Sequence, residues 1–249
     1  MVLVLDRYCI DRYESILVDV PGGRPLSPYH PPLASYTTFL RDRHADALRW
    51  EREATAAPAV EQFPELPRWQ AAGVRAYRAT SRPGAVPSAY LTLASAREAC
   101  EAAGKRLCSR AEWQRACRGA DDEPFPNGDA YRQGTCNVFR EDHPGRLLFG
   151  NMTVGMLDPR MNLVKAGGKP LLRPTGATPA CVSRWGGDAI HDMVGNLDEW
   201  VDEPDGTFVG AFYSRSARDG CAHVTTTHGA SYFDYSIGAR CCLDTPNPL

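Results

Sequence analysis

The sequence lacks the features by which several common protein classes are recognised. No apolar run approaches the 18 residues that a membrane-spanning helix needs, and no block of basic residues indicates a nucleic-acid or acidic-membrane partner. The motifs GxSxG, GxGxxG and HExxH and the Walker phosphate loop are all absent. We therefore expect no membrane insertion and no nucleic-acid binding. The oligomeric state cannot be read from the sequence.

Cysteine, in contrast, is abundant, with nine residues among 249. No two cysteines have CxxC spacing, which argues against a zinc ribbon or a thioredoxin-like motif. Scattered cysteines at this density favour structural disulfides and a secreted or periplasmic protein, with buried free thiols as the alternative. A cytoplasmic location stays open, because the start MVLVLDRYCIDRYE has no signal-peptide pattern. The odd count leaves at least one thiol without a partner in the chain.

Three regions of the chain differ in amino-acid composition and sequence pattern. Residues 2–19 are rich in β-formers and predict one or two strands. Residues 20–89 are rich in proline and predict an insertion into a single domain of residues 1–249, with a solvated helix over 38–54. Beyond Gly119 the helical period disappears and glycine is frequent. That composition predicts irregular α+β structure with long loops.

Residues 90–119 predict two short helices. In the first, Ser95 and Glu98 form a capping box and Gly104 ends the helix. In the second, Ser109 and Glu112 form the capping box. Apolar residues recur at helical spacing in both: Ala96, Ala99, Cys100 and Ala103 in the first, and Trp113, Ala116 and Cys117 in the second. We expect these positions to be buried.

Several segments resemble, in order, the formylglycine-generating-enzyme (sulfatase-modifying-factor) family. They are CIDRYE (9–14), GKRLCSRAEWQRACRG (104–119), FPNGD (125–129), CNV (136–138), DMVGNLDEWVDE (192–203), HGASY (228–232) and IGARCC (237–242). The resemblance implies an α+β, C-type-lectin-like fold with little regular secondary structure. It does not by itself imply the family's founding activity, because one fold can carry several functions.

That activity is a copper-dependent oxidation, in which two cysteines bind the metal and a peptide cysteine becomes formylglycine. Thiolate pairs select Cu(I). In the matching stretch GASYFDYSIGARCC, Ser231 keeps the family serine beside the copper pair, but Asp234 stands where the first cysteine is expected. The first cysteine of the stretch is Cys241. We take Ser231, Asp234 and Cys241 as candidate catalytic residues. Asp198 likewise stands where the family enzyme has a tryptophan.

A different transition-metal site is conceivable just before this stretch. Cys221 and His223, two residues apart, would share one face of a strand, and His228 follows closely. With Asp234 they would offer sulfur, nitrogen and oxygen ligands to copper, iron or zinc. The alternative is that Cys221 forms a disulfide. Cys241 and Cys242 cannot easily chelate one ion, because adjacent side chains on an extended chain point in opposite directions. We expect one of them to pair with a distant cysteine.

The resemblance also implies calcium sites. The segment DMVGNLDEW would bind one ion through the side chains of Asp192 and Glu199 and the carbonyls of Gly195 and Leu197. A second site would begin at Asn137 with the carbonyl of Val138, and Asp158 is one candidate for its later carboxylate. Mixed carboxylate and carbonyl oxygens suit calcium. The alternative for residues 192–199 is an acidic turn without a metal.

Three hypotheses for function follow. The first is a divergent family member without the copper pair, which binds a peptide or a small molecule in the family groove or carries out a different metal-dependent oxidation. The second is a copper-dependent oxidase that forms formylglycine. The third is a lectin-like binding module stabilised by calcium and disulfides.

Overall fold

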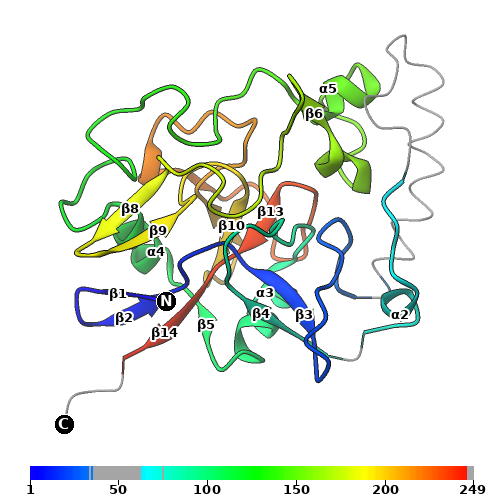
Figure 1. Cartoon of the computed structure of the whole chain (residues 1–249), viewed down its shortest axis with the longest axis horizontal. Coiled ribbons are helices and arrows are strands. Elements are labelled where there is room, and N and C mark those ends of the chain that lie inside the picture. The colour runs from blue at the N-terminus through cyan, green and yellow to red at the C-terminus, as the bar shows by residue number, and fades with distance from the viewer. Residues whose placement is uncertain (34, 36–62, 75, 246–249) are drawn as a thin grey trace.

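Two four-stranded sheets form the centre of the fold in the computed structural model, which describes residues 1–33, 35, 63–74 and 76–245 (Figure 1). The first sheet has the order β1-β2-β14-β5, and its strands span Val2–Val4, Tyr8–Ile10, Cys241–Asp244 and Arg106–Leu107. The second has the order β12-β11-β10-β13, and its strands span Val224–Thr225, Thr207–Val209, Asp198–Val201 and Ile237–Ala239. The sheets share one stretch of chain, because β13 continues through Arg240 into β14.

The two ends of the chain meet in the first sheet. β14 pairs antiparallel with β2, with Cys242 opposite Ile10 and Leu243 opposite Cys9. Figure 1 shows this as the red C-terminal strand beside the blue N-terminal hairpin. In the second sheet, β10 pairs parallel with β13 and antiparallel with β11. The C-terminal segment therefore holds both sheets together.

The strand structure predicted over residues 2–19 is confirmed, but it consists of three strands instead of one or two: β1, β2 and β3 (Ile16–Asp19). β3 pairs antiparallel with β4 (Tyr77–Thr80), which lies within the predicted insertion. This end of the proline-rich range therefore packs with the core. The helix predicted over 38–54 lies outside the described residues.

The two predicted helices are α3 (Leu93–Glu101) and α4 (Arg110–Cys117). The Ser109–Glu112 capping box of α4 is confirmed. The box predicted for α3 is wrong: the N-cap is Thr92, and its partner is Ser95. The physical reason is that Ser95 also fits the third helical position, while the Glu98 carboxylate accepts a hydrogen bond from Tyr77 at 2.8 Å. The predicted apolar positions are buried except Ala103, which lies beyond the helix end.

The remaining elements are short, as expected for irregular α+β structure. They are α2 (Arg68–Ala71), α5 (Pro144–Phe149), the 3-10 helices η1 (Pro159–Leu163) and η2 (Gly220–Ala222), the hairpin β6 (Lys165–Ala166) and β7 (Lys169–Pro170), and the hairpin β8 (Val182–Trp185) and β9 (Asp188–His191). Within the described ranges, no helix is both long and apolar enough to span a membrane.

Eight of the nine cysteines form disulfides, which confirms the expectation from composition. The pairs are Cys100–Cys241, Cys108–Cys242, Cys117–Cys221 and Cys136–Cys181. Among the described residues, which include every cysteine, Cys9 is the free one. The neighbours Cys241 and Cys242 have different partners, on α3 and just after β5, as their opposite directions on a strand require.

Candidate functional site

The loop that matches the family's copper segment is closed around Asp234. One carboxylate oxygen accepts hydrogen bonds from the backbone N–H and the hydroxyl of Ser236, at 2.8 and 2.7 Å. The other accepts one from the hydroxyl of Tyr232 at 2.7 Å. Asp234 is buried, and burial raises the pKa of its carboxyl. Asp234 therefore serves to fold this loop, and Ser231, at its start, is exposed.

Asp198 lies next to this loop. It is the first residue of β10, is fully buried, and has Arg215 Nη2 3.1 Å from its Oδ2. Burial raises the pKa of Asp198 to about 7; Arg215 acts to lower it, and the charge of Asp234 to raise it. The two positions that differ from the family's pattern are thus electrostatic neighbours. One arginine serves two buried carboxylates there.

The cysteines considered as metal ligands are engaged in disulfides. Cys241 is bonded to Cys100, and Cys221 to Cys117. With Asp234 in place of the first cysteine as well, the residues present do not fit a copper site built from two thiolates. This structure provides no thiolate at the positions the copper chemistry needs.

The geometry predicted for the other transition-metal set is also different. Cys221 lies in η2, so it does not share a strand face with His223. The ring of His228 stacks on Phe208 and Tyr232, with centroids 5.7 and 3.9 Å away. Within the described part of the chain, no three His, Cys, Asp or Glu side chains are grouped so as to hold a metal ion.

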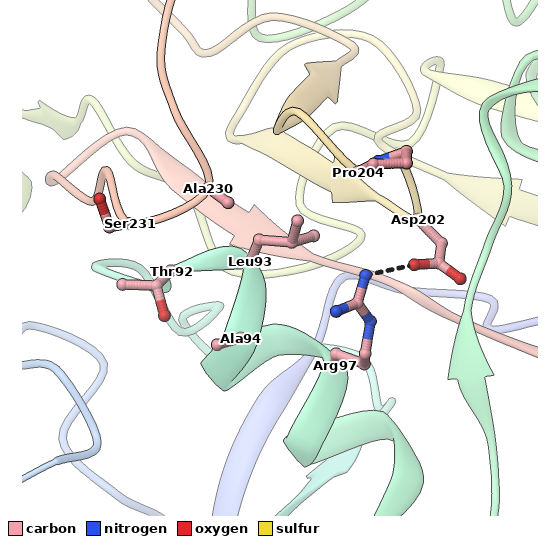
Figure 2. Close-up of a pocket in the computed structure, with 8 residues that line it drawn as sticks. All are labelled: Thr92, Leu93, Ala94, Arg97, Asp202, Pro204, Ala230 and Ser231. Carbon is pink, nitrogen blue, oxygen red and sulfur yellow. Dashed lines mark hydrogen bonds and ion pairs between the residues drawn. The ribbon is translucent and has the colours of Figure 1, made fainter.

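A surface cavity of about 640 Å³ lies beside Ser231 (Figure 2). Its wall combines the N-terminal turn of α3, the end of β10 with the turn that follows, and the loop at 230–231. Figure 2 shows Ser231 and Thr92 on one side and the Arg97–Asp202 ion pair on the other. Its lining residues are Thr92, Leu93, Ala94, Arg97, Asp202, Pro204, Ala230 and Ser231. We call this cavity the Ser231 pocket.

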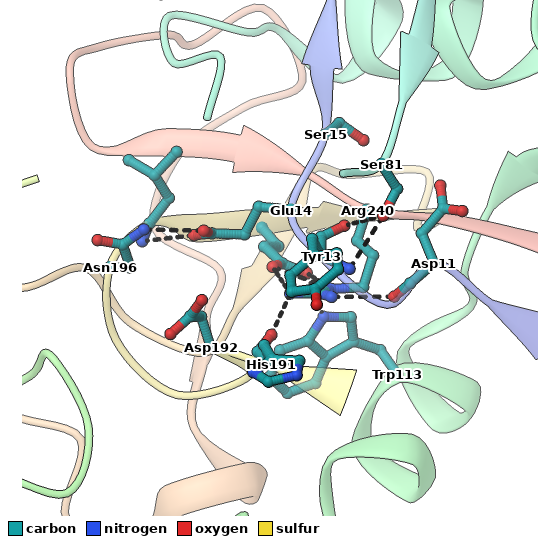
Figure 3. Close-up of polar contacts among 12 residues, drawn as sticks. Asp11, Tyr13, Glu14, Ser15, Ser81, Trp113, His191, Asp192, Asn196 and Arg240 are labelled. Carbon is teal, nitrogen blue, oxygen red and sulfur yellow. Dashed lines mark hydrogen bonds and ion pairs between the residues drawn. The ribbon is translucent and has the colours of Figure 1, made fainter. Parts of the chain in front are cut away.

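A separate polar cluster is buried beneath the predicted calcium loop (Figure 3). Arg240, fully buried, donates to both carboxylate oxygens of Glu199 at 2.9 to 3.2 Å. The indole N–H of Trp113 donates to Glu199 Oε2 at 2.6 Å. Four hydrogen-bond contacts thus surround this one carboxylate, which fills its acceptor positions.

Two more carboxylates complete the cluster. Glu14 accepts hydrogen bonds from the side chain of Asn196 and the backbone N–H of Leu197, at 2.8 and 3.2 Å. Asp192 accepts one from the backbone N–H of Gly176 at 2.7 Å. Burial raises the pKa of both, to about 6 for Asp192, and the neighbouring carboxylates add to the effect. Arg240 offsets this negative charge at both residues, and the charge of Arg173 also acts to lower the pKa of Asp192.

These contacts bear on the first predicted calcium site, formed by Asp192, Gly195, Leu197 and Glu199. Asp192 and Glu199 are brought together, but Arg240 holds Glu199. A guanidinium cation is already bound to the carboxylate that calcium would need. The residues present therefore fit an internal ion pair better than a calcium ion at Glu199.

The second predicted site, at Asn137 and Val138, packs directly against the first. The carbonyl of Asn137 accepts the N–H of Asn196 at 2.9 Å. Gly195 (φ +90°) is needed here, because a Cβ on it would lie 2.3 Å from that carbonyl oxygen. The amide oxygen of Asn137 accepts a hydrogen bond from Arg140 at 3.2 Å, and Asp158 pairs with Arg160. The two predicted side-chain ligands of this site, Asn137 and Asp158, are thus bound by arginines.

Sequence reasoning did not identify Glu14, Arg215 or Arg240. Glu14 and Arg240 lie inside the segments CIDRYE and IGARCC, so a charged residue within a motif was the available signal. Arg215 has no such signal. Its partner Asp198 is 17 residues away along the chain, and only folding brings the two together.

Comparison with known proteins identifies the family. A search of curated proteins found no match. Solved structures that are similar include one titled "Crystal Structure of CarF", with 13% identity, 94% of this chain and 99% of that chain covered, and a TM-score of 0.40. Another is titled "Structure of PvdO from Pseudomonas aeruginosa", with 15% identity, 96% and 94% covered, and a TM-score of 0.38. A family model described as "Sulfatase-modifying factor enzyme 1-like domain" matches residues 34–247. This chain therefore belongs to the sulfatase-modifying-factor (formylglycine-generating-enzyme) family and has its α+β fold.

Proposed function

We propose that this protein is a divergent family member that binds a peptide or a small molecule in the Ser231 pocket and does not form formylglycine. The observation that carries the proposal is the loop at 228–236. Its serine is kept at the edge of a cavity, while a hydrogen-bonded aspartate occupies the position of the first copper cysteine. The disulfides of Cys241 and Cys221 support the same conclusion.

The pocket lining suits a ligand with both apolar and polar parts. Leu93, Ala94 and Ala230 offer apolar contacts, and the exposed hydroxyl of Ser231 offers a hydrogen bond. The Arg97–Asp202 pair is substantially exposed, so it is held weakly and a ligand carboxylate or amine can replace either partner. A cavity of this size accommodates a few peptide residues or one small molecule.

Binding is tested with a fluorescently labelled peptide that contains Cys-x-Pro-x-Arg, the motif that the family's oxidase acts on. We expect the peptide to bind, and Ala94→Trp, which fills the pocket, to weaken binding about tenfold. Ala102→Trp is the control, because Ala102 is exposed at the other end of α3 and does not line the pocket. Absence of binding, or equal effects of the two variants, would refute a peptide site in this pocket.

Activity is tested with the same peptide, Cu(I) and air, with aldehyde formation measured by mass spectrometry. We expect no aldehyde. Aldehyde formed at a rate proportional to protein would show that the chain is a copper oxidase after all, and it would overturn the proposal.

The second candidate is a binding module stabilised by disulfides and calcium. The four disulfides favour it. That calcium stabilises the module stays a prediction. Elemental analysis, and thermal melting with and without a chelator, would test it. Under the first proposal, Arg240 already neutralises Glu199, so we expect a calcium chelator to leave the melting temperature unchanged. Stoichiometric calcium and a lower melting temperature in the chelator would support the calcium-bound module instead.

A further inference from the structure

A second cavity, of about 330 Å³, lies beside the Asn137 loop and shares no lining residue with the Ser231 pocket. Its wall contains two arginines, Arg140 and Arg173, together with Asn137 and the aromatic rings of Tyr131 and Phe139. Both arginines are half-buried. We call this cavity the arginine pocket.

Neither arginine of the pocket has a carboxylate partner among the described residues. Arg140 donates to the amide oxygen of Asn137 at 3.2 Å, and Arg173 to the hydroxyl of Thr178 at 3.1 Å. Both acceptors are neutral. Other shielded arginines of this protein behave differently, because Arg215 and Arg240 each pair with a buried carboxylate.

The two guanidinium groups also repel each other. Burial lowers the pKa of Arg173, and the like charge of Arg140 lowers it further. The opposite charge of Asp192 raises this pKa but only partly compensates. Two like charges held together at a partly desolvated site have an energetic cost that a bound anion would relieve. The anion would gain charge-assisted hydrogen bonds from both groups.

The backbone keeps this arrangement in place. The side chain of Asn196 accepts a hydrogen bond from the N–H of Arg173 at 2.9 Å and donates one to its carbonyl at 3.1 Å. The N–H of Arg140 donates to the carbonyl of Tyr213 at 3.1 Å. A ligand therefore meets two arginines on a fixed backbone, which lowers the entropic cost of binding.

Two acidic residues, Glu141 and Asp142, also line the pocket. In the described structure neither carboxylate lies within ion-pair distance of Arg140 or Arg173, and Glu141 is exposed. They form no direct ion pair with the two arginines. The rings of Tyr131 and Phe139, whose centroids are 4.4 Å apart, form an apolar wall of the pocket.

We propose that the arginine pocket binds the oxyanion group of a small molecule, a phosphate or a carboxylate, between Arg140 and Arg173. The planar guanidinium group presents N–H donors in a geometry that matches the oxygens of a phosphate or a carboxylate. The rings of Tyr131 and Phe139 would contact the rest of the ligand. This site is independent of the function proposed for the Ser231 pocket.

The test is calorimetric titration of the whole chain with inorganic phosphate and, separately, with acetate, at constant ionic strength set with chloride. We expect at least one anion to bind, and Arg173→Gln and Arg140→Gln each to weaken binding about tenfold or more. Both substitutions keep the backbone contacts with Asn196 and Tyr213, and thermal melting verifies that the variants fold. The comparison of phosphate with acetate identifies the kind of oxyanion.

Arg132→Gln is the matched control, because Arg132 is an exposed arginine of the same segment that does not line the pocket. We expect this variant to change the affinity less than about twofold. If neither anion binds, or if Arg132→Gln weakens binding as much as the pocket variants, the proposal is wrong. Binding that disappears with added chloride in wild type and in all variants alike would also overturn it, since it would reflect net charge alone.

Discussion

At the scale of single residues, arginine pairing is the main feature of the interior. Arg160 and Arg240 are fully buried and pair with the buried carboxylates of Asp158 and Glu199. Arg215 reaches the buried Asp198 from a partly exposed position. A buried charge is tolerated only when it is paired and hydrogen-bonded, so each pair depends on both partners.

The Arg240–Glu199 pair gives the first prediction. Arg240→Met leaves Glu199 charged and buried without its cation, and we expect a loss of about 3 to 5 kcal/mol in the free energy of unfolding. Arg97→Met, which breaks an exposed pair, should cost less than about 1 kcal/mol. Urea unfolding followed by circular dichroism measures both. Similar losses for the two variants would contradict the central role of the buried pair.

His143 gives a prediction on pH. Burial and, next, the charge of Arg146 lower the pKa of His143 to about 4. The unfolded chain binds a proton near pH 6.5 and the folded chain only near pH 4, so stability falls as the pH drops through this range. We expect acidification from pH 7 to 5 to cost about 1 kcal/mol through this residue, reduced by its partial exposure.

The matched variant for this prediction is His143→Asn. His143 caps α5 by accepting the N–H of Gly145 at 3.1 Å, and an asparagine oxygen can accept the same bond without titrating. His143→Asn also loses the contact between Nε2 and the Tyr235 hydroxyl, so the melting temperatures of the two proteins should differ by a constant amount above about pH 6.5 and by a changing amount only below it. Parallel curves over the whole range would show that His143 does not titrate as expected.

At the scale of elements, strand β10 separates the two buried clusters. Successive side chains of a strand point to opposite faces, so Asp198 meets Arg215 on one side and Glu199 meets Arg240 and Trp113 on the other. All four residues of β10 are buried, so both faces of the strand are covered, and its two edges are paired with β11 and β13. One short strand thus supplies a carboxylate beside the Ser231 loop and another to the interior.

Helix α4 gives a prediction at the same scale. Its N-cap Ser109 accepts the N–H of Glu112, and the Glu112 carboxylate accepts the N–H of Ser109 in return. Ser109→Ala should lower the free energy of unfolding by about 1 kcal/mol, and Ser109→Asn should restore most of it. Chemical denaturation checks both. Equal stability of the alanine and asparagine variants would show that the cap contributes little.

At the scale of the whole molecule, disulfides join segments far apart in the sequence. Cys100–Cys241 and Cys108–Cys242 fix the C-terminal strand to the region of α3 and β5 across 141 and 134 residues. Cys117–Cys221 fixes α4 to η2 across 104 residues. Long cross-links of this kind reduce the entropy of the unfolded chain.

The disulfides give two linked expectations. Without reductant, the native protein should show one reactive thiol, Cys9, and the reduced, unfolded chain should show nine. The double substitution Cys117→Ala and Cys221→Ala should cost about 4 kcal/mol of stability. Thiol titration and urea unfolding measure these. Nine titratable thiols in a non-reduced, unfolded sample would contradict the disulfide framework.

Local sequence patterns were enough to predict the family, the early strands, the α4 capping box and the buried faces of two helices, because these depend on local spacing and on residue types at fixed offsets. The sequence also indicated disulfides, though not their pairing. Only the tertiary structure placed Arg240 on Glu199, Arg215 on Asp198, and Arg140 beside Arg173. Each of these contacts joins side chains distant in sequence, and the geometry that brings charges together is set by packing, which no local pattern encodes.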